Sequence, residues 1–252
     1  MYPVSLKTML RCFLRSYLTS SAFNTRGMQN IGLAYAIDPG LQEIYPDHHN
    51  LQRARRRHVK LYNSHHLWNP ILIALFLNLE KKISRGLFPP QAMPKVKSTL
   101  VFTLSAIGDS FFSGSLLVTW SLITILLIFL NLGAFALALG IALLVVVQIF
   151  KLITFHKGAT QGLIFINQLK KWNLINWGSR LKQLNSFLIP AFWLVIWPFE
   201  WHIYNFILLA AAALILTYLY RIFVWSREIL IMCILGLLFL APQAFSWLEG
   251  KF

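Results

Sequence analysis

Acidic residues and cysteines are both scarce in this 252-residue chain. Eight Asp/Glu stand against 23 Lys/Arg, which gives a formal net charge of +15. The two cysteines, Cys12 and Cys233, lie in a basic segment and in an apolar run, so we expect no disulfide framework and no thiol metal site. The sequence also lacks a Walker loop, a GxSxG nucleophile motif and paired carboxylates. We therefore expect a chain without catalytic residues and without a cofactor.

The seven histidines do not form a metal-binding pattern. Two adjacent pairs, His48-His49 and His65-His66, project in different directions on a helix or a strand, whereas metal ligands must converge. No HExxH motif and no Cys/His array is present. We therefore predict no metal site and interpret the histidines as part of a solvated polar face. The basic run "LQRARRRHVK", residues 51–60, is interpreted as a solvated helix or a patch that contacts lipid headgroups.

Apolar residues dominate the remainder of the chain. They make up 57% of the sequence against 12% charged residues, and the mean hydropathy is +0.61, which is typical of an integral membrane protein. Four apolar runs approach or exceed the roughly 20 residues that cross a bilayer as a helix. A further segment, 186–202, is interrupted by Pro190 and Pro198 and is interpreted as a broken crossing. The sequence thus predicts an all-α membrane protein with about five transmembrane helices, four of which are the runs 110–130, 132–153, 203–222 and 229–247.

The distribution of charge predicts the topology. Residues 1–98 hold 14 Lys/Arg against 4 Asp/Glu, a net charge of +10, and residues 151–182 hold 6 Lys/Arg and no acid. Between these regions lie two spans, which are joined by a tight turn at Asn131, Leu132 and Gly133. Both regions therefore face the same compartment, which the positive-inside rule identifies as the cytoplasm. We therefore expect residues 1–98 to form a cytoplasm-facing region of amphipathic and re-entrant helices, and residues 99–252 to form a transmembrane region with a cytoplasmic loop at 154–184. The charge is attributed to topology and to contact with membrane lipids, and nucleic acid is not expected as a partner.

Two shorter helices are predicted in the first 98 residues. Leu6, Leu10, Leu14 and Leu18 recur at helical spacing beside basic residues, which favours an amphipathic helix lying on the membrane over a transit peptide. The segment "WNPILIALFLNLEKK" has too few apolar residues to span a bilayer and predicts a re-entrant or protein-buried helix. Helix breaks are expected at Pro39-Gly40, Pro46, Pro70 and the prolines of 89–94.

The stretch "LSAIGDSFFSGS", residues 104–115, places a carboxylate inside an apolar run. A helix over 99–130 would be about 48 Å long, too long for one straight span. Because Asp and Ser are favoured N-caps, we predict a helix break at Gly108, Asp109 and Ser110, with a new helix beginning there. Asp109 is then either a cap or a residue of a transport pathway.

Small and polar residues complete the set of candidates. Ala106, Ser110 and Gly114 recur at i+4, and Gly158 and Gly162 form a second pair. Such stripes let helices approach closely, either within the chain or between subunits. Polar side chains also occur beside apolar helix, where they either bind a sugar hydroxyl or form buried hydrogen bonds; they are Asn63, Asn69 and Asn78.

Three segments, in order, resemble the IID membrane subunit of the mannose/fructose/sorbose-type sugar phosphotransferase system. The segment 13–46 resembles the N-terminal signature of that family, with Arg-Ser, an aromatic-Asn pair, Met-Gln, Gly and Ile-Tyr-Pro. The segment 56–82 resembles its block of Arg-His, aromatic-Asn-Ser and Pro-Ile-Leu. The third, "KVKSTLVFTLSAIGDSFFSGS", resembles its block around Gly-Asp. The resemblance covers about residues 11–251 and is weaker after residue 165.

The resemblance implies a non-catalytic subunit of a bacterial inner-membrane permease. Such subunits pair with a IIC subunit to carry a hexose-type sugar inward, while IIA and IIB proteins relay phosphate to it. It also implies that the Gly108-Asp109 break lies in the translocating core. The chain departs from the family pattern at Arg26-Gly27, at Lys81 after Glu80, and at Ser113. A transport-inactive scaffold or regulatory protein of the same fold is therefore the alternative.

Overall fold

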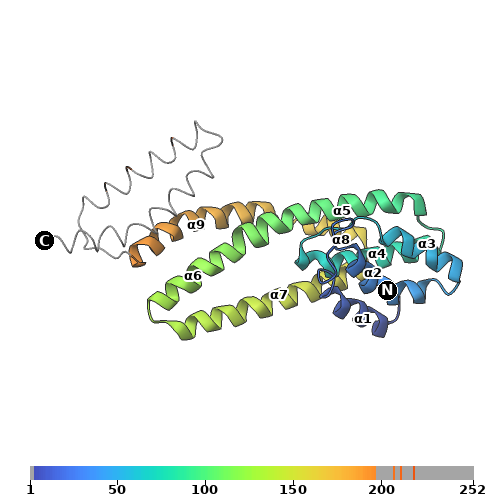
Figure 1. The fold of residues 1–252 in the computed structure, drawn as a ribbon, viewed down its shortest axis with the longest axis horizontal. Helices are drawn as coiled ribbons and strands as arrows, with labels where there is room; N and C mark the ends of the chain where they lie inside the picture. The colour runs from blue at the N-terminus through green and yellow to red at the C-terminus, as the bar shows by residue number, and fades with distance from the viewer. Residues whose placement is uncertain (1–2, 197–206, 208–210, 212–217, 219–252) are drawn as a thin grey trace. The chain divides into compact units, whose positions relative to one another are not determined.

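The computed structural model describes residues 3–196 and the isolated positions 207, 211 and 218 (Figure 1). The chain divides into two compact units, Met1–Ile196 and Trp197–Phe252, and the architecture below is that of the first. Its described part is helical throughout, with only isolated bridges that join Asn24, Met28 and Tyr62. The functional division near residue 98 stays a prediction.

Four helices form the N-terminal part of this unit: α1 (Leu6–Ser16), α2 (Asn30–Ile44), α3 (His48–His58) and α4 (Asn69–Ser84). A short 3₁₀ turn, His66–Trp68, leads into α4, and Pro70 occupies the first turn of that helix, where its missing N–H is not needed. The helices α1 and α2 pack on each other and both contact α4. The predicted break at Pro46 is confirmed, because α2 ends just before it and α3 follows.

The helix α4 is the centre of this region. Its residues from Ile71 to Leu77 are all 0% exposed, so the prediction of a protein-buried helix is confirmed. The helices α2 and α7 (Gly133–Gln161) pack against it at two glycines. A Cβ at Gly40 would collide with Leu77, and a Cβ at Gly158 would lie 3.2 Å from Ile71. The backbones of α2 and α7 therefore approach α4 more closely than any larger residue would permit.

The predicted break at Pro39-Gly40 is wrong, because α2 continues through both residues. Proline removes the hydrogen bond that would reach the carbonyl four residues earlier, which here belongs to Tyr35. The Arg15 guanidinium donates to this Tyr35 oxygen at 3.2 Å and also lies 4.3 Å from the centre of the Tyr35 ring. A side chain of α1 thus replaces the lost backbone donor, and the helix survives.

A continuous helix runs from α5 (Met93–Gly108) through a π-helical segment (Asp109–Leu116) into α6 (Leu117–Phe129). The predicted helix break at Gly108, Asp109 and Ser110 is therefore wrong: the backbone widens into π geometry and does not break. Asp109 has helical dihedral angles, and its side chain makes no capping hydrogen bond at the start of the π segment. The length problem is resolved differently, because α5 packs on α4 and on the 3₁₀ turn before it, while the π segment and α6 together cover the apolar span.

The helices α6 and α7 form an antiparallel hairpin (Figure 1). The turn at 131–133 is confirmed, with Asn131 in the left-handed region at φ 59°. Two helices, Pro90–Phe129 and Gly133–Gln161, are long and apolar enough to cross a membrane, and they contain the predicted spans 110–130 and 132–153 almost entirely. The predicted spans 203–222 and 229–247 lie outside the described residues.

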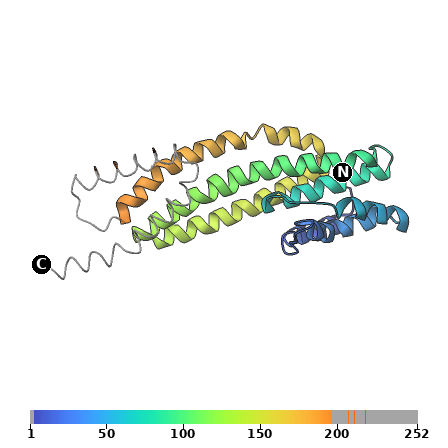
Figure 2. The ribbon, with the colours of Figure 1, turned by 45° about the horizontal axis from the view of Figure 1, so that its top comes forward.

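The segment 154–184 is more regular than a loop. The helix α7 extends to Gln161, α8 covers Leu163–Lys170, and α9 begins at Leu174 and continues to Ile196 through Pro190. Pro190 therefore does not break the helix. The α9 helix packs along the π segment and α6, so α6 lies between α7 and α9 (Figure 2).

The face of α1 that does not pack on α2 carries the predicted leucine stripe. Leu6, Leu10, Leu14 and Leu18 are all exposed, whereas Met9 and Cys12 face the core. The prediction of an amphipathic helix is confirmed, and its contact with a membrane surface stays a prediction.

Candidate functional site

The π segment is held against the loop before α4. Gly108 allows this contact: a Cβ there would lie 2.6 Å from the His65 Cβ and 2.8 Å from the Trp68 Nε1. The glycine predicted to break the helix therefore permits close packing instead. The His65 ring stacks on Phe112 at 5.5 Å, and Phe112 meets the edge of Trp68 at the same centroid distance.

In the wider π turns, side chains donate hydrogen bonds to backbone carbonyl oxygens. The Ser115 hydroxyl donates to the Ser110 carbonyl oxygen at 2.8 Å. The Ser115 carbonyl oxygen accepts from Thr119 at 2.9 Å and from the Asn185 amide of α9 at 3.3 Å, and Thr119 also donates to the Asn185 Oδ1. Asn185 is only 6% exposed. A buried amide on α9 thus takes up a backbone carbonyl group of the π segment. π-Helical turns of this kind are frequent at functional sites.

The outer face of the π segment is polar. Asp109 and Ser113 are exposed, Ser110 is half-buried, and the Lys182 Nζ lies 3.4 Å from the Ser110 Oγ. Ser113 forms a 3.0 Å hydrogen bond with the His65 Nε2. The Asp109 carboxylate forms no hydrogen bond or ion pair with any side chain in the described part of the chain. These groups make up the candidate site, which we call the π-segment site: His65, Asp109, Ser110, Ser113 and Lys182.

His65 is held neutral by its surroundings. Burial lowers the pKa of His65 to about 4, and the neighbouring His66 and Lys151 act in the same direction, while the Asp109 carboxylate opposes them. The pKa of His66 is lowered as well, mainly by burial and to a lesser degree by the positive charge of Lys151. A neutral imidazole at neutral pH offers one donor and one acceptor, which suits hydrogen bonding to a hydroxyl group rather than to an anion.

The two predicted stripes of small residues differ: the first is not aligned on one helix face, and the second packs within the chain. Ala106 is exposed, and the π turns shift Gly114 away from the i+4 register that would align it with Ala106 and Ser110. Gly158 packs inside the chain on α4. Gly162 has φ 59° and ends α7, where a Cβ would collide with the Asn78 side chain. For the Gly158/Gly162 pair, the structure places both glycines in contacts within the chain.

The predicted asparagines are not brought together. Asn63 is exposed on the loop before α4. Asn69 is 1% exposed and accepts a 2.7 Å hydrogen bond from the Tyr62 hydroxyl, and Asn78 donates to the Ala159 carbonyl oxygen at 2.9 Å. Buried hydrogen bonding, one of the two interpretations, therefore describes Asn69 and Asn78.

A second cluster surrounds Glu80, whose side chain is 0% exposed. Arg57 donates to both carboxylate oxygens, at 3.0 Å and 2.6 Å, and the Tyr45 hydroxyl donates to the Oε2 at 2.8 Å. The His58 Nε2 lies 2.9 Å from the Oε1. These four residues form what we call the Glu80 network; Tyr45 directly follows α2, and the others lie on α3 and α4. It ties the N-terminal helices together through one carboxylate.

Electrostatics agree with this arrangement. Burial opposes ionisation of Glu80, but the hydrogen bonds from His58 and Arg57 outweigh it and lower the pKa to about 2. The interpretation of residues 51–60 as solvated is wrong for Ala54 and His58, which are 0% exposed, and for Arg57, which pairs with the buried Glu80. Arg55 pairs with Asp38 at 2.7 Å, but 40% of its side chain stays exposed. The solvated interpretation is also wrong for His65, which is 7% exposed. A sequence signal was present, because Glu80 lies one turn after Phe76 in α4, at the end of the apolar run.

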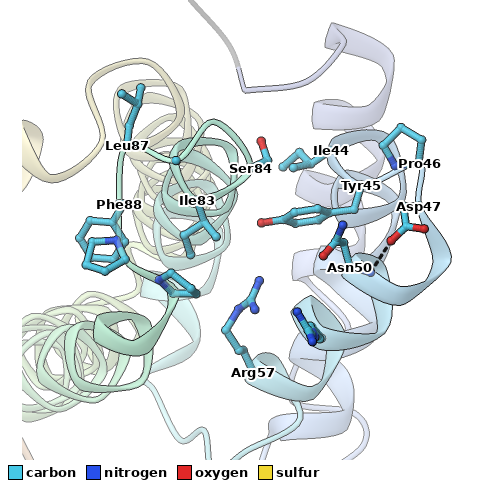
Figure 3. A pocket seen from close by; sticks show the side chains of 14 residues that line it. Ile44, Tyr45, Pro46, Asp47, Asn50, Arg57, Ile83, Ser84, Leu87 and Phe88 are labelled. Carbon is cyan, nitrogen blue, oxygen red and sulfur yellow. Dashed lines mark hydrogen bonds between the residues drawn. The ribbon is translucent and has the colours of Figure 1, made fainter.

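A cavity of about 660 Å³ lies beside the Glu80 network (Figure 3). Tyr45 and Arg57 point into it from α2 and α3, and Ile83 and Ser84 border it from the end of α4. Among the described residues, no group of three or more His, Cys, Asp or Glu side chains could hold a metal ion.

The fold and the distribution of apolar surface define a helical membrane protein. The sequence model of the PTS system mannose/fructose/sorbose family IID component matches residues 3–191, about three quarters of the chain. The chain therefore belongs to this family, as the resemblance implied.

Curated relatives and solved structures agree with this assignment. The mannose-specific EIID components of Escherichia coli K12 and of Escherichia coli O157:H7 are each 28% identical over 105 residues, which is 41% of this chain and 37% of the relatives' own length. A solved membrane protein superposes with a TM-score of 0.64 at 21% identity, over 75% of this chain and 70% of its own. A chain of the mannose transporter ManYZ in complex with microcin E492 gives a TM-score of 0.58 at 17% identity over 98% of both chains.

Proposed function

We propose that this chain is the membrane-embedded IID subunit of a mannose-family sugar permease. In this proposal it acts with a IIC subunit to carry a hexose-type sugar inward, and IIA and IIB carriers phosphorylate the sugar at the cytoplasmic face. The chain itself contributes no phosphorylated residue. The observation that carries the proposal is the family match over residues 3–191, which includes the N-terminal helices, the π segment and the α6–α7 hairpin.

The IIC partner is supported by the surface of the chain. Large apolar residues of α7, such as Leu137 at 67% and Leu144 at 62% exposure, are uncovered in the isolated chain. Asp109 and Ser113 are also exposed, beside an apolar span, where hydrocarbon would not solvate them. Lipid or a partner subunit can cover the apolar face of α7, and a partner subunit or a water-filled pathway can solvate Asp109 and Ser113. A IIC subunit would meet both requirements.

Affinity purification from the native membrane tests the proposal. A tagged form of this chain, extracted in mild detergent, should bring down a IIC subunit in a fixed ratio. A chain that stays monodisperse and folded without any partner would contradict the obligate partnership.

The topology can be tested separately. We expect the N-terminus and residues 154–184 in the cytoplasm and the C-terminus outside. Single cysteines placed at these positions in a variant without Cys12 and Cys233 report the side from which an impermeant thiol reagent reaches them. Labelling of position 170 from outside would overturn this orientation.

The role of Asp109 in transport follows from the same proposal. Because the Asp109 carboxylate bonds to no described side chain, Asp109→Asn should leave assembly with IIC intact, and a pathway role predicts that sugar uptake falls. Uptake equal to wild type in Asp109→Ala, with normal assembly, would remove Asp109 from the pathway.

The alternative is a scaffold of the same fold that does not transport. It is favoured by the departures at Arg26-Gly27, Lys81 and Ser113. Gly27 and Ser113 are accommodated in the fold, since the Gly27 N–H donates to Asn24 at 2.8 Å and Ser113 bonds to His65. Normal copurification with IIC but unchanged sugar uptake on deletion of this chain would support the scaffold.

A further inference from the structure

A small basic cavity lies between the end of α3 and the first turns of α5. Its volume is about 210 Å³. Its lining has a polar side, formed by Arg57, Lys60, Asn63, Lys97 and Ser98, and an apolar side, formed by Leu61, Pro94, Val101 and Phe102. Three of the five polar side chains are cationic, and the lining contains no Asp or Glu. The cavity is smaller than the roughly 300–1,000 Å³ typical of drug-sized ligands.

Lys97 is the most unusual of these residues. Lys97 is only 4% exposed. Its ammonium group donates one hydrogen bond among the described residues, to the His58 carbonyl oxygen at 3.1 Å. The ammonium group also lies 5.7 Å from the centre of the Tyr62 ring. An ammonium has three donors, and a buried charge normally requires a charged partner. The structure describes no carboxylate paired with Lys97.

The neighbouring cations do not relieve this deficit. Arg57 is neutralised by Glu80, but Lys60, an exposed residue that lines the same cavity, adds a further positive charge. The known contact of Lys97 with the end of α3 accounts for one donor as a C-terminal cap. This cap explains neither why a second lysine, Lys60, lines the same cavity nor why the lining contains no acidic residue.

We propose that this cavity binds a phosphate-bearing anion. The cations Lys60 and Lys97 supply the charge, Arg57 supplies a guanidinium fixed in place by Glu80, and the Asn63 amide and the Ser98 hydroxyl can each donate to a phosphate oxygen. Donors from several directions match the several oxygens of a phosphate. The cavity admits a phosphate group with a small substituent, so the ligand is either a free phosphate or phosphate monoester from the aqueous phase, or the headgroup of an anionic phospholipid.

This site does not depend on the transport role proposed above, because it rests on the lining residues alone. Binding can therefore be tested with purified protein, without uptake. A ligand that binds only the folded protein raises its apparent melting temperature in proportion to the logarithm of its concentration. The probes are sodium phosphate and phosphatidylglycerol.

The first arm uses protein in phosphatidylcholine nanodiscs, titrated with sodium phosphate against sodium chloride at equal ionic strength. Phosphate should raise the melting temperature of the wild type. In Lys60→Gln, the phosphate concentration at half-maximal effect should rise about tenfold, the loss expected for one charge-assisted contact. Lys97→Met should show the same loss. Lys95→Gln is the matched control, since Lys95 is an exposed lysine on the same helix and does not line the cavity.

The second arm replaces part of the phosphatidylcholine with phosphatidylglycerol and omits free phosphate. A response to phosphatidylglycerol alone that is lost in Lys60→Gln identifies a lipid headgroup as the ligand, and a response to free phosphate identifies a soluble one. The proposal is overturned if Lys60→Gln and the wild type respond equally in both arms. It is equally overturned if Lys95→Gln loses as much as Lys60→Gln, because the effect is then general charge screening.

Discussion

The helices α4 and α7 bury their apolar residues in opposite ways. Residues 71–77 of α4 are inaccessible because α2, α5 and α7 surround them. On α7, Leu137, Leu144 and Val146 are each more than 60% exposed. Both helices are apolar, so composition alone does not distinguish them. The difference lies in what covers them: α4 is covered by its own chain, and α7 requires lipid or another subunit.

Polar residues differ between the two regions in the same way. Near α4 they are charged and paired, as in the Glu80 network, because neighbouring helices deliver cations to a buried carboxylate. Where α6 packs on α9, the buried polar side chains are neutral and bond to a backbone carbonyl group, as Thr119 and Asn185 do. Neutral hydrogen bonds are the less expensive solution inside a bilayer. The N-terminal region is therefore built like a water-soluble core, and the hairpin is built for the membrane.

The largest effect is expected from removing the charge at the centre of the N-terminal region. Glu80→Gln leaves Arg57 half-buried without its counter-charge and should lower stability by about 3–5 kcal/mol. The unfolding temperature in detergent measures the loss. Glu43→Gln is the control, because Glu43 is an exposed carboxylate that bonds to Ser5, and it should change stability by less than about 1 kcal/mol. Equal losses in the two variants would mean that the Glu80 network does not hold this region together.

The junction between the two regions should be the next most sensitive place. Gly108→Ala places a Cβ against His65 and Trp68 and should lower stability by about 1–3 kcal/mol. Gly133→Ala should be neutral or slightly stabilising, since nothing lies within 4 Å of a Cβ at that position. Thermal unfolding of both variants compares them directly. A neutral Gly108→Ala would show that the π segment is not pressed against the loop before α4.

A smaller effect is expected inside the membrane region. Asn185→Leu removes the hydrogen bonds to Thr119 and to the Ser115 carbonyl. It should lower stability by about 0.6 kcal/mol, the average for hydrogen bonds between transmembrane helices, and by about 1.7 kcal/mol at most. Gln183→Leu changes an exposed amide on the same helix and serves as the control. Unfolding in nanodiscs measures both, and a stabilised Asn185→Leu would contradict the role assigned to this amide.

The smallest effect concerns pH. The folded protein keeps His65 neutral down to about pH 4, whereas an unfolded histidine binds a proton near pH 6.5. The unfolded state thus binds more protons between these values, so stability should fall as the pH drops through this window. With His65→Gln, the unfolding temperature should depend less steeply on pH between 6.5 and 5. Some dependence should remain, because burial lowers the pKa of His58 as well. An unchanged slope would contradict this assignment.

Local signals were sufficient for parts of this fold. Pro70 marked the start of α4, Asn131 marked the hairpin turn, and the apolar runs before and after it became α6 and α7. Each of these features depends on residues close together in sequence. The predicted break at Gly108 failed because its glycine serves a contact with His65, which is 43 positions away and visible only in three dimensions.

The candidate site was predictable only in part for the same reason. Asp109 and Ser110 were identified from their polarity within an apolar run. The partners come from the loop before α4, as His65 does, and from α9, as Lys182 and Asn185 do. Nothing in the local pattern connects them to the π segment. The rescue of α2 at Pro39 by Arg15 shows the same limit, since the strong local signal of a proline was overruled by a side chain from another helix.

The most direct test of the central claim is sugar uptake in the native host with this chain deleted and then restored. Cells that retain their IIA, IIB and IIC proteins should lose phosphorylation-coupled uptake of a hexose such as mannose when this chain is absent. They should regain it with the wild-type chain and not with Glu80→Gln, whose N-terminal region is destabilised. Uptake that is the same with and without this chain would contradict the account of a permease subunit.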